Sequence, residues 1–218
     1  MLKKKSLKLD IDWINNIRVN LSAVERRTST LTKRRTVKKE YQVAWLLRSI
    51  SLLDLTTLEG DDTLGKVEKL CAKGLSPISS EILNKLNIPY GTIHVGAICV
   101  YHDLVAHAKK ILNGKLPIAV VSTGFPAGLS SFNTRKNEIV NSIKDGADEI
   151  DIVINRSLVL RNEWNKLYNE IRDFKHIAKG KKLKAILGVG DLGTLRNVAK
   201  SSLVAMMAGA DFIKTSTG

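Results

Sequence analysis

The chain has few cysteines, few aromatic residues and no long hydrophobic run. Its two cysteines, Cys71 and Cys99, are spaced neither like metal ligands nor like a disulfide framework, which predicts free thiols in a reducing compartment. No stretch of about 18 apolar residues is present, so no membrane span is expected. The basic opening Met1 to Lys5 is not followed by an apolar segment, which argues against a secretory signal. We therefore expect a cytoplasmic protein, with the nucleus as an alternative location.

Aromatic residues make up 5% of the sequence and are not interleaved with the basic side chains. Proteins that bind single-stranded nucleic acid use such interleaving to stack the bases, so specific nucleic-acid binding is not expected. The four histidines, at positions 94, 102, 107 and 176, show neither metal-ligand spacing nor the partners of a catalytic triad. We interpret all four as structural.

Charge is strongly unbalanced. Lysine and arginine together number 35 against 21 acidic residues, which gives a formal net charge of +14. The excess is densest at Lys3 to Lys8, at Arg26 and Arg27, and at Lys33 to Lys39. Such a balance suits a phosphate-bearing small molecule, and it also suits a basic interaction surface for RNA or a protein. Both readings, enzyme and non-catalytic interaction protein, stay open at this point.

The pattern of apolar residues divides the chain into two parts. Residues 1–49 show an interrupted helical pattern, which we interpret as an N-terminal helical extension. In residues 50–218, short apolar runs alternate with amphipathic segments, as in repeated βα units with a buried parallel sheet. Strands are expected at Ser51–Leu55, Val95–Val100, Ile118–Ser122, Glu149–Ile154, Leu183–Leu187 and Phe212–Thr215.

Amphipathic helices are expected between these strands. The clearest one places Trp164, Leu167, Tyr168, Ile171 and Phe174 on a single stripe. The other expected helical segments are Leu64–Lys73, Asp103–Leu112, Thr134–Lys144 and one with a stripe of Leu195, Val198, Ala199, Ser202 and Met206.

A short repeat links the two most reactive candidate residues. Gly146-Ala147-Asp148 and Gly209-Ala210-Asp211 each end an expected helix and begin a strand. Asp151 and Lys214 follow these repeats at the same offset, and their separation fits two βα units, which assigns them to the fourth and sixth strands. Alternate strands of a (β/α) barrel supply side chains to one interior layer, so the two residues should meet. The alternative is a purely structural ion pair.

A buried lysine facing an aspartate suggests carbonyl chemistry. A lysine attacks a carbonyl only as the free amine, and burial or a neighbouring cation must lower its pKa from about 10.4. Asp151 is placed to move protons. Lys184 can face the same chamber and tune both groups, or it can be an exposed lysine at a strand start. The hydroxyls of Thr215 and Thr217 are candidate donors to a substrate.

Five short motifs follow one another along the chain: Leu53-Asp54-Leu55-Thr56-Thr57-Leu58, Ala97-Ile98-Cys99-Val100-Tyr101, Gly124-Phe125-Pro126-Ala127-Gly128, Ala147-Asp148-Glu149-Ile150-Asp151 and Ala210-Asp211-Phe212-Ile213-Lys214-Thr215-Ser216-Thr217-Gly218. Taken together and in this order, they resemble those of the deoxyribose-phosphate aldolases. The likeness to the animal branch of that family extends into the N-terminal extension, so it covers nearly the whole chain.

The resemblance implies a lyase: a class I aldolase of deoxyribonucleotide catabolism. Such an enzyme cleaves 2-deoxy-D-ribose 5-phosphate to glyceraldehyde 3-phosphate and acetaldehyde without a cofactor. Lys214 matches the family's Schiff-base lysine and Asp151 its proton-relay aspartate. Further candidates for substrate binding are Asp54, Thr56, Cys99, Lys184, Thr215 and Thr217. A Schiff-base barrel enzyme for another sugar phosphate is the nearest alternative.

The chain departs from the family pattern in three places. His102 replaces a proline, and Gly190-Asp191-Leu192 stands where Gly-Glu-Leu is usual. The family continues past the Lys-Thr-Ser-Thr-Gly motif with two more βα units, a second catalytic lysine and phosphate-binding glycines. The resemblance therefore implies a TIM (β/α)8 barrel with about its last two units missing from this chain. We expect weak or no activity from these 218 residues alone, and association through open strand edges into a homo-oligomer.

Overall fold

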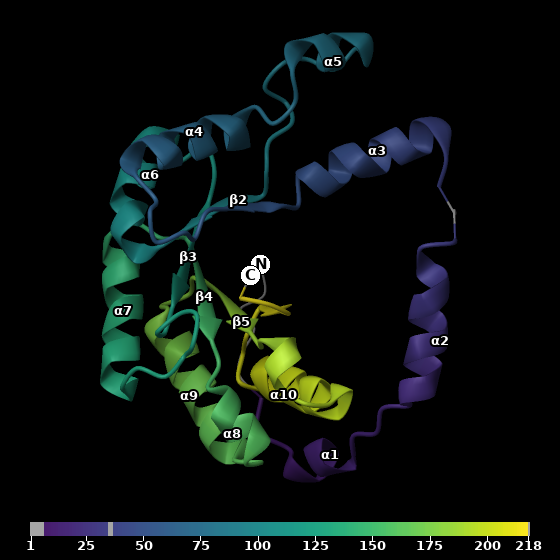
Figure 1. Ribbon diagram of the computed structural model, residues 1–218. Coiled ribbons are helices and arrows are strands. Elements are labelled where there is room, and N and C mark those ends of the chain that lie inside the picture. Colours follow the sequence, from purple (N-terminus) through teal and green to yellow (C-terminus); the bar gives the residue numbers. More distant parts are fainter. Residues whose placement is uncertain (1–6, 35–36, 218) are drawn as a thin grey trace. The chain divides into compact units, whose positions relative to one another are not determined.

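The structure, a computed structural model, describes residues 7–34 and 37–217 (Figure 1). Its strands are β1 (Asp54–Thr56), β2 (Ala97–Val100), β3 (Ile118–Ser122), β4 (Glu149–Val153), β5 (Lys182–Ile186) and β6 (Phe212–Lys214). They form one sheet in the order β1-β2-β3-β4-β5-β6. Parallel strands that follow one another in sequence order are typical of a (β/α) barrel, because a doubly wound sheet reverses its order. The predicted fold class is confirmed.

Helices join the strands, as the amphipathic segments predicted. The α-helices are α1 (Ile11–Asn16), α2 (Leu21–Leu31), α3 (Lys39–Ile50), α4 (Leu64–Leu75), α5 (Ser80–Lys85), α6 (Val105–Leu112), α7 (Phe132–Lys144), α8 (Arg156–Leu160), α9 (Trp164–Ile177) and α10 (Leu195–Met207). Two 3₁₀ turns, η1 (His102–Leu104) and η2 (Val189–Asp191), precede α6 and α10. Within the described ranges, no helix combines the length and hydropathy that crossing a bilayer requires.

The predicted strand boundaries hold to within about two residues, with one larger error at the first strand. We expected that strand to begin at Ser51, but α3 continues to Ile50 and the Ser51 N–H still bonds to the Leu47 carbonyl, at 3.3 Å. The strand therefore starts at Asp54. The apolar residues Leu52 and Leu53 suggested a strand, but they belong to the link between helix and strand and are exposed.

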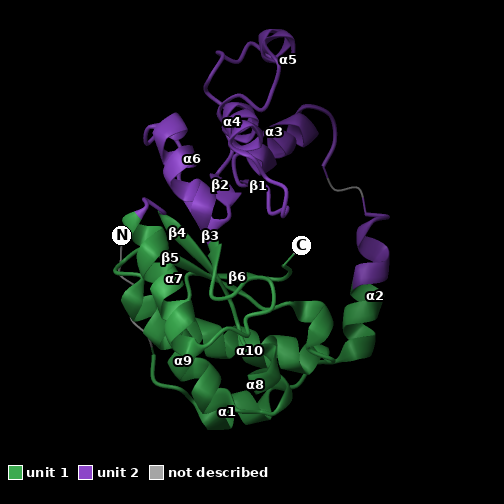
Figure 2. Cartoon of the chain, turned by 60° about the vertical axis from the view of Figure 1, so that its left-hand side comes forward, with its two compact units in different colours: residues 1–27, 121–144, 148–218 green, residues 28–120, 145–147 purple. Residues whose placement is uncertain are grey.

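The described chain forms two compact units (Figure 2). Unit 1 contains residues up to 27, residues 121–144 and residues from 148 onward, and so includes β4, β5 and β6 with α7, α8, α9 and α10. Unit 2 contains residues 28–120 and 145–147, and so includes β1 and β2 with α3, α4, α5 and α6.

In unit 1, α9 buries the face that the sequence predicted, from Trp164 to Phe174. The predicted stripe of α10 is wrong. Leu195 and Met206 are 41% and 48% exposed, and the buried residues are Ser201, Val204, Ala205 and Met207. The sequence of this helix carries two stripes that fit the helical period, and the second one is buried.

In unit 2, α4 packs on β2 and on α6. Gly74 of α4 lies so close to the strand that a Cβ atom there would stand 2.5 Å from Cδ1 of Ile98, so a larger residue would have to displace that side chain. Cys71 is buried beside it as a free thiol, and burial raises the pKa of that thiol. By contrast, α3 has no buried residue and exposes Tyr41 and Trp45.

Candidate active site

The strands of unit 1 carry a charged face. Because successive side chains of a strand alternate between the two faces, β4 places Glu149 and Asp151 on the same side. Asp151 is the register partner of Lys184, and Lys182 pairs in the same way with Glu149. Lys214 of β6 pairs with Ile186, two residues after Lys184, and therefore shares this side. We call the five charged residues Glu149, Asp151, Lys182, Lys184 and Lys214 the polar-face network.

Strand stagger explains how Lys214 meets Asp151. Along the hydrogen-bond ladder Asp151 aligns with Lys184 and then with Phe212, so Lys214 lies two residues further along β6. In an eight-stranded barrel with a shear of about eight, the strands are offset by about one residue per strand. Two strands give an offset of two residues, which returns Lys214 to the layer of Asp151.

The contact between the two residues is direct. Nζ of Lys214 donates a hydrogen bond to Oδ2 of Asp151 at 2.8 Å. The Asp151 side chain is fully buried, whereas that of Lys214 is 30% exposed. Nζ of Lys184 lies 3.3 Å from the other carboxylate oxygen, Oδ1. The sequence predicted these three residues together, and the structure brings them together; their catalytic roles stay predictions.

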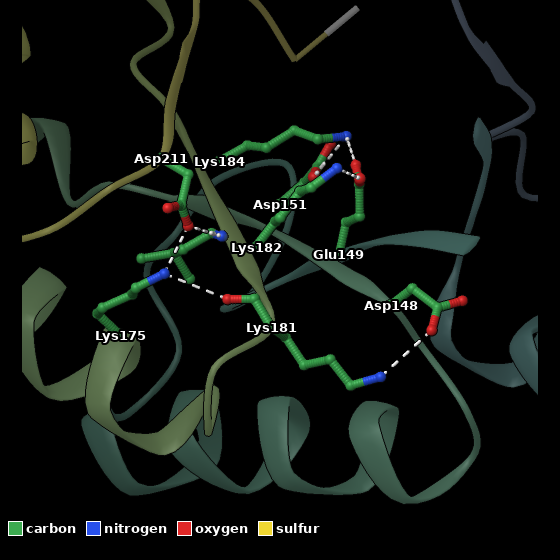
Figure 3. A network of polar contacts seen from close by, with 9 residues as sticks. Asp148, Glu149, Asp151, Lys175, Lys181, Lys182, Lys184 and Asp211 are labelled. Atoms are coloured by element: carbon green, nitrogen blue, oxygen red, sulfur yellow. Dashed lines mark hydrogen bonds and ion pairs between the residues drawn. The ribbon is translucent and has the colours of Figure 1, made fainter. Parts of the chain in front are cut away.

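Glu149 completes the polar-face network, and sequence reasoning missed it. Its Oε2 lies 2.7 Å from Nζ of Lys184, and its Oε1 accepts a hydrogen bond from Lys182 at 2.9 Å (Figure 3). Burial raises the pKa of Glu149, but the hydrogen bonds and charges of Lys184 and Lys182 lower it by more, so its pKa lies below the ordinary glutamate value. A signal was present in the sequence, since Glu149 has the same strand parity as Asp151.

The segment after β6 is fixed by backbone bonds. The N–H groups of Leu187 and Val189 donate to the carbonyls of Lys214 and Thr215, each at 2.9 Å. Thr215 is exposed and Thr217 is half-buried. Thr215 also lines a cleft of about 800 Å³, together with residues of the loop before α10 and, unpredicted, Val19 and Leu21 of the N-terminal segment. A small molecule can therefore lie next to the residue that follows Lys214.

The loop between β3 and α7 has a fixed shape. The Gly124 N–H donates to Glu138 at 2.8 Å, and the Gly128 N–H donates to the Gly124 carbonyl at 2.8 Å. Gly128 has a φ of +72°, and a Cβ atom there would stand 2.9 Å from the Ile154 carbonyl oxygen. Only glycine suits such a position, so the loop is more than an ordinary turn.

The remaining predicted site residues lie in unit 2. Cys99 of β2 is fully buried, and Asp54 of β1 is half-buried. Thr56 is exposed and donates its hydroxyl to the Asp54 carbonyl at 2.9 Å. The N-cap of α4 is Thr63, so Asp54 does not cap that helix. Lys214, Asp151 and Lys184 thus lie together in unit 1. The other predicted residues of this paragraph, Asp54, Thr56 and Cys99, belong to unit 2.

Comparison with known proteins places this arrangement in a family. The family model described as "DeoC/LacD family aldolase" matches residues 48–218. The chain belongs to the DeoC/LacD family of aldolases. It is 50% identical to human deoxyribose-phosphate aldolase over 217 residues, which cover 98% of this chain and 68% of the human protein.

Solved structures of aldolases share the fold. One is QR15, an aldolase, with a TM-score of 0.65 and 26% identity over 78% of this chain and 68% of that one. Another is the tetrameric deoxyribose phosphate aldolase of Aeropyrum pernix, with a TM-score of 0.61 and 21% identity over 78% of this chain and 65% of that one. This DeoC/LacD aldolase is thus a lyase, and nothing in the comparisons supports a non-catalytic interaction protein.

No three His, Cys, Asp or Glu side chains gather as a metal site within residues 7–34 and 37–217. What the polar-face network offers instead is an amine, a buried carboxylate against it and a second cation. These are the groups that covalent carbonyl chemistry with proton transfer requires.

Proposed function

We propose that this aldolase cleaves 2-deoxy-D-ribose 5-phosphate to D-glyceraldehyde 3-phosphate and acetaldehyde through a Schiff base on Lys214. The observation that carries the proposal is the 2.8 Å contact between Nζ of Lys214 and the fully buried Asp151. The lysine is the more exposed partner, so its amine can reach a substrate while the carboxylate stays in place.

The reaction begins with formation of an imine. The free amine of Lys214 adds to the C1 aldehyde of the open-chain sugar, which gives a carbinolamine. Loss of water, in which Asp151 relays a proton from solvent to the departing hydroxyl group, leaves a protonated imine. Lys184 beside Asp151 adds a second cation near Lys214, and a nearby cation disfavours a protonated lysine. The proposed reaction requires this effect to leave part of the Lys214 amine uncharged at neutral pH.

The protonated imine then acts as an electron sink. Asp151, directly or through a water molecule, takes the proton of the C3 hydroxyl, and the electrons of the C2–C3 bond move to the imine nitrogen. Glyceraldehyde 3-phosphate leaves and an enamine remains on Lys214. Protonation of the enamine at C2 and addition of water release acetaldehyde and restore the free lysine. Both protons pass within reach of one carboxylate, which is the reason for its burial beside the amine.

The other parts of the proposal concern the surroundings of Lys214. Asp54, Thr56, Cys99, Lys184, Thr215 and Thr217 are its proposed substrate-binding residues. Residues 1–49 are proposed as a helical extension of a catalytic domain at 50–218, acting without metal or organic cofactor. Two buried free cysteines support a cytoplasmic location. A homo-oligomer is proposed as well, since the similar Aeropyrum pernix enzyme is tetrameric.

Substrate-dependent trapping tests the proposal. Borohydride reduces an imine to a stable secondary amine and accumulates it, so even slow imine formation is detected. Because weak or no activity is expected of these 218 residues alone, we expect slow and incomplete covalent labelling with 2-deoxyribose 5-phosphate, at concentrations where unphosphorylated 2-deoxyribose and ribose 5-phosphate give less. Equal labelling by all three sugars would contradict the proposed substrate, and absence of labelling would contradict the Schiff base.

A further inference from the structure

Thr123, the residue that follows β3, has a backbone conformation that β-branched residues rarely adopt. Its φ is +64°, in the left-handed region, where a branched side chain crowds the backbone. Within residues 7–34 and 37–217, the other non-glycine residues with a positive φ are exposed asparagines and lysines. Thr123, by contrast, is fully buried. Strained conformations of this kind persist where the surrounding structure holds them, and they cluster at functional sites.

The Thr123 hydroxyl binds both backbone groups of Val153, the last residue of β4. Its oxygen Oγ1 accepts from the Val153 N–H at 2.8 Å, and the hydroxyl donates to the Val153 carbonyl at 3.0 Å. Val153 is fully buried, and a buried backbone group that loses its partner is costly. These two bonds require the Thr123 side chain to lie against β4, which accounts for the conformation of its backbone.

The bonds to Thr123 lie on the edge of β4 that faces β3, and the other edge is held by β5. Val153 is the register partner of Ile186, and the next N–H, that of Ile154, donates to the Ile186 carbonyl at 3.1 Å. The chain leaves the sheet directly afterwards, because Asn155 is the N-cap of α8. Thr123 therefore fixes β4 at its last residue before this turn.

The end of β4 lies close to the proposed proton-relay residue. Asp151 stands two residues before Val153, about 7 Å along the strand and with its side chain on the same face. It is fully buried and contacts Nζ of Lys214 at 2.8 Å. The proposed cleavage requires Asp151 to lie within hydrogen-bond reach of the C3 hydroxyl. A misplacement of about 1 Å can lower a rate by about 10²-fold, so movement of β4 affects the reaction through Asp151.

We propose that Thr123 is a positioning residue, whose hydroxyl fixes the end of β4 and so holds the Asp151 carboxylate within reach of Lys214 and the sugar. The inference rests on the proposed function and deepens it. The loop after Thr123 supports the same arrangement, because Gly128 packs on the end of β4: a Cβ atom there would stand 3.1 Å from Cγ1 of Val153. Thr123 acts through the strand and not on the sugar itself.

The test separates the two stages of the proposed reaction on Lys214. With 2-deoxyribose 5-phosphate and borohydride, the imine present before cleavage is reduced to a five-carbon adduct. After cleavage, protonation of the enamine gives a two-carbon imine, which is reduced to an ethyl group. Mass spectrometry of the Lys214 peptide, at short times and with protein in excess over sugar, gives the ratio of the ethyl to the five-carbon adduct. A loss of folded protein lowers both adducts and leaves this ratio unchanged.

Three variants of Thr123 decide the inference. Thr123→Val removes the hydroxyl and keeps the shape of the side chain, and we expect it to lower the ratio about tenfold because Asp151 is held less well. Thr123→Gly also lacks the hydroxyl but relieves the strain, so it serves if the valine variant does not fold, and the same fall is expected. Thr123→Ser keeps the hydroxyl and should show the wild-type ratio. A wild-type ratio in folded Thr123→Val or Thr123→Gly, or a lowered one in Thr123→Ser, overturns the inference.

Ser201→Ala is the matched control. It also removes a fully buried hydroxyl of unit 1, but one that donates to the carbonyls of Asn197 and Val198 in α10, at 2.8 and 3.1 Å. We expect it to leave the ratio unchanged. An equal fall in the control would show that the loss of any buried hydroxyl has this effect, and the inference would be wrong.

Amide hydrogen exchange, measured without sugar, lets the two proposals fail separately. In Thr123→Val and Thr123→Gly we expect about tenfold faster exchange at Val153, spreading to Asp151, and wild-type exchange in Thr123→Ser. If the wild type forms no ethyl adduct but the exchange rates change in this way, the proposed function is wrong and Thr123 still fixes β4. If the wild type forms the ethyl adduct and the ratio or the exchange rates do not change, the inference alone is wrong.

Discussion

Two ion networks of similar composition lie on the same three strands of unit 1. The polar-face network joins Glu149, Asp151 and three lysines within β4, β5 and β6. The second, which we call the strand-start network, lies just before these strands: Asp211 accepts from Lys175 at 2.5 Å and from the Leu183 N–H at 2.8 Å, and Lys181 donates to Asp148 at 3.2 Å (Figure 3). The two copies of the Gly-Ala-Asp repeat supply Asp148 and Asp211 to the strand-start network, and they stand directly before the strands that carry Asp151 and Lys214.

The difference between the networks is burial and the use of backbone groups. Asp211 binds the Leu183 N–H as well as a lysine, so it ties one strand to the next. The pair of Lys181 and Asp148 is about one third exposed and is screened by water. In the polar-face network Asp151 is fully buried between two lysines. Pairing of lysine with aspartate therefore does not by itself distinguish the two networks. The full burial of Asp151 does.

Removal of the amine gives the largest expected contrast. Lys214→Met should abolish both sugar cleavage and borohydride trapping, because no other lysine forms the imine. Lys175→Met, which removes a lysine from the strand-start network, should keep trapping in the folded fraction. Acetaldehyde release and mass spectrometry of the reduced protein measure both. Borohydride trapping that persists in Lys214→Met would contradict the assignment of the imine to the polar-face network.

Removal of an aspartate gives the next contrast. Asp151→Asn should lower cleavage by about 10²–10⁴-fold, the usual contribution of a positioned acid–base group, while some label still reaches Lys214. Asp211→Asn should leave the rate per folded molecule unchanged and cost about 1–3 kcal/mol of the free energy of unfolding, since it weakens a partly buried charged hydrogen bond. Rates and urea unfolding of the two variants are to be compared. Similar rate losses in both would contradict the assignment.

A fall in pH should reduce the contribution of Glu149 to the free energy of unfolding. Because its pKa in the folded state is depressed, its contribution to stability is complete above the ordinary glutamate pKa of about 4.3 and is lost as the pH falls through the folded value. Glu149→Gln should therefore be less stable than the wild type by about 3 kcal/mol at neutral pH, and the difference should shrink below about pH 4. Urea unfolding at several pH values measures it. A stability difference between the wild type and Glu149→Gln that grows as the pH falls would contradict this prediction.

Removal of an exposed lysine gives the smallest effect. Lys181→Gln breaks the contact with Asp148, in which both side chains are about one third exposed. We expect a loss of at most about 1 kcal/mol in the free energy of unfolding, smaller still in high salt, and no change in trapping. Urea unfolding at low and high salt checks this. A loss of stability as large as that of Asp211→Asn would mean that the strength of these ion pairs does not depend on their exposure.

The strands and the meeting of Lys214 with Asp151 were predictable from the sequence. Buried parallel strands appear as short apolar runs, and the repeat fixed the offset of both residues, so local patterns carried the information. The buried side of α10 was mispredicted because two stripes fitted the helical period. The lining of the cleft by Val19 and Leu21 was missed because contact between segments so far apart in the chain leaves no local pattern.

Glu149 was missed for a different reason. Glu149 and Asp151 alternate on β4 as Lys182 and Lys184 do on β5, and this matching parity is visible in the sequence. The pairing of acids with lysines, however, depends on the register between the two strands, which the sequence does not state. A shift of the register between β4 and β5 by one residue would place the acidic residues and the lysines on opposite faces of the sheet.

The most direct test of the account is to ask which lysine forms the imine. The chain is treated with acetaldehyde at neutral pH, reduced with borohydride and digested, and the ethylated lysines are counted at low extent of reaction. We predict that Lys214 carries nearly all of the label, because it is the free amine held against Asp151. Label spread evenly over the exposed lysines, or concentrated on Lys184, would contradict the account.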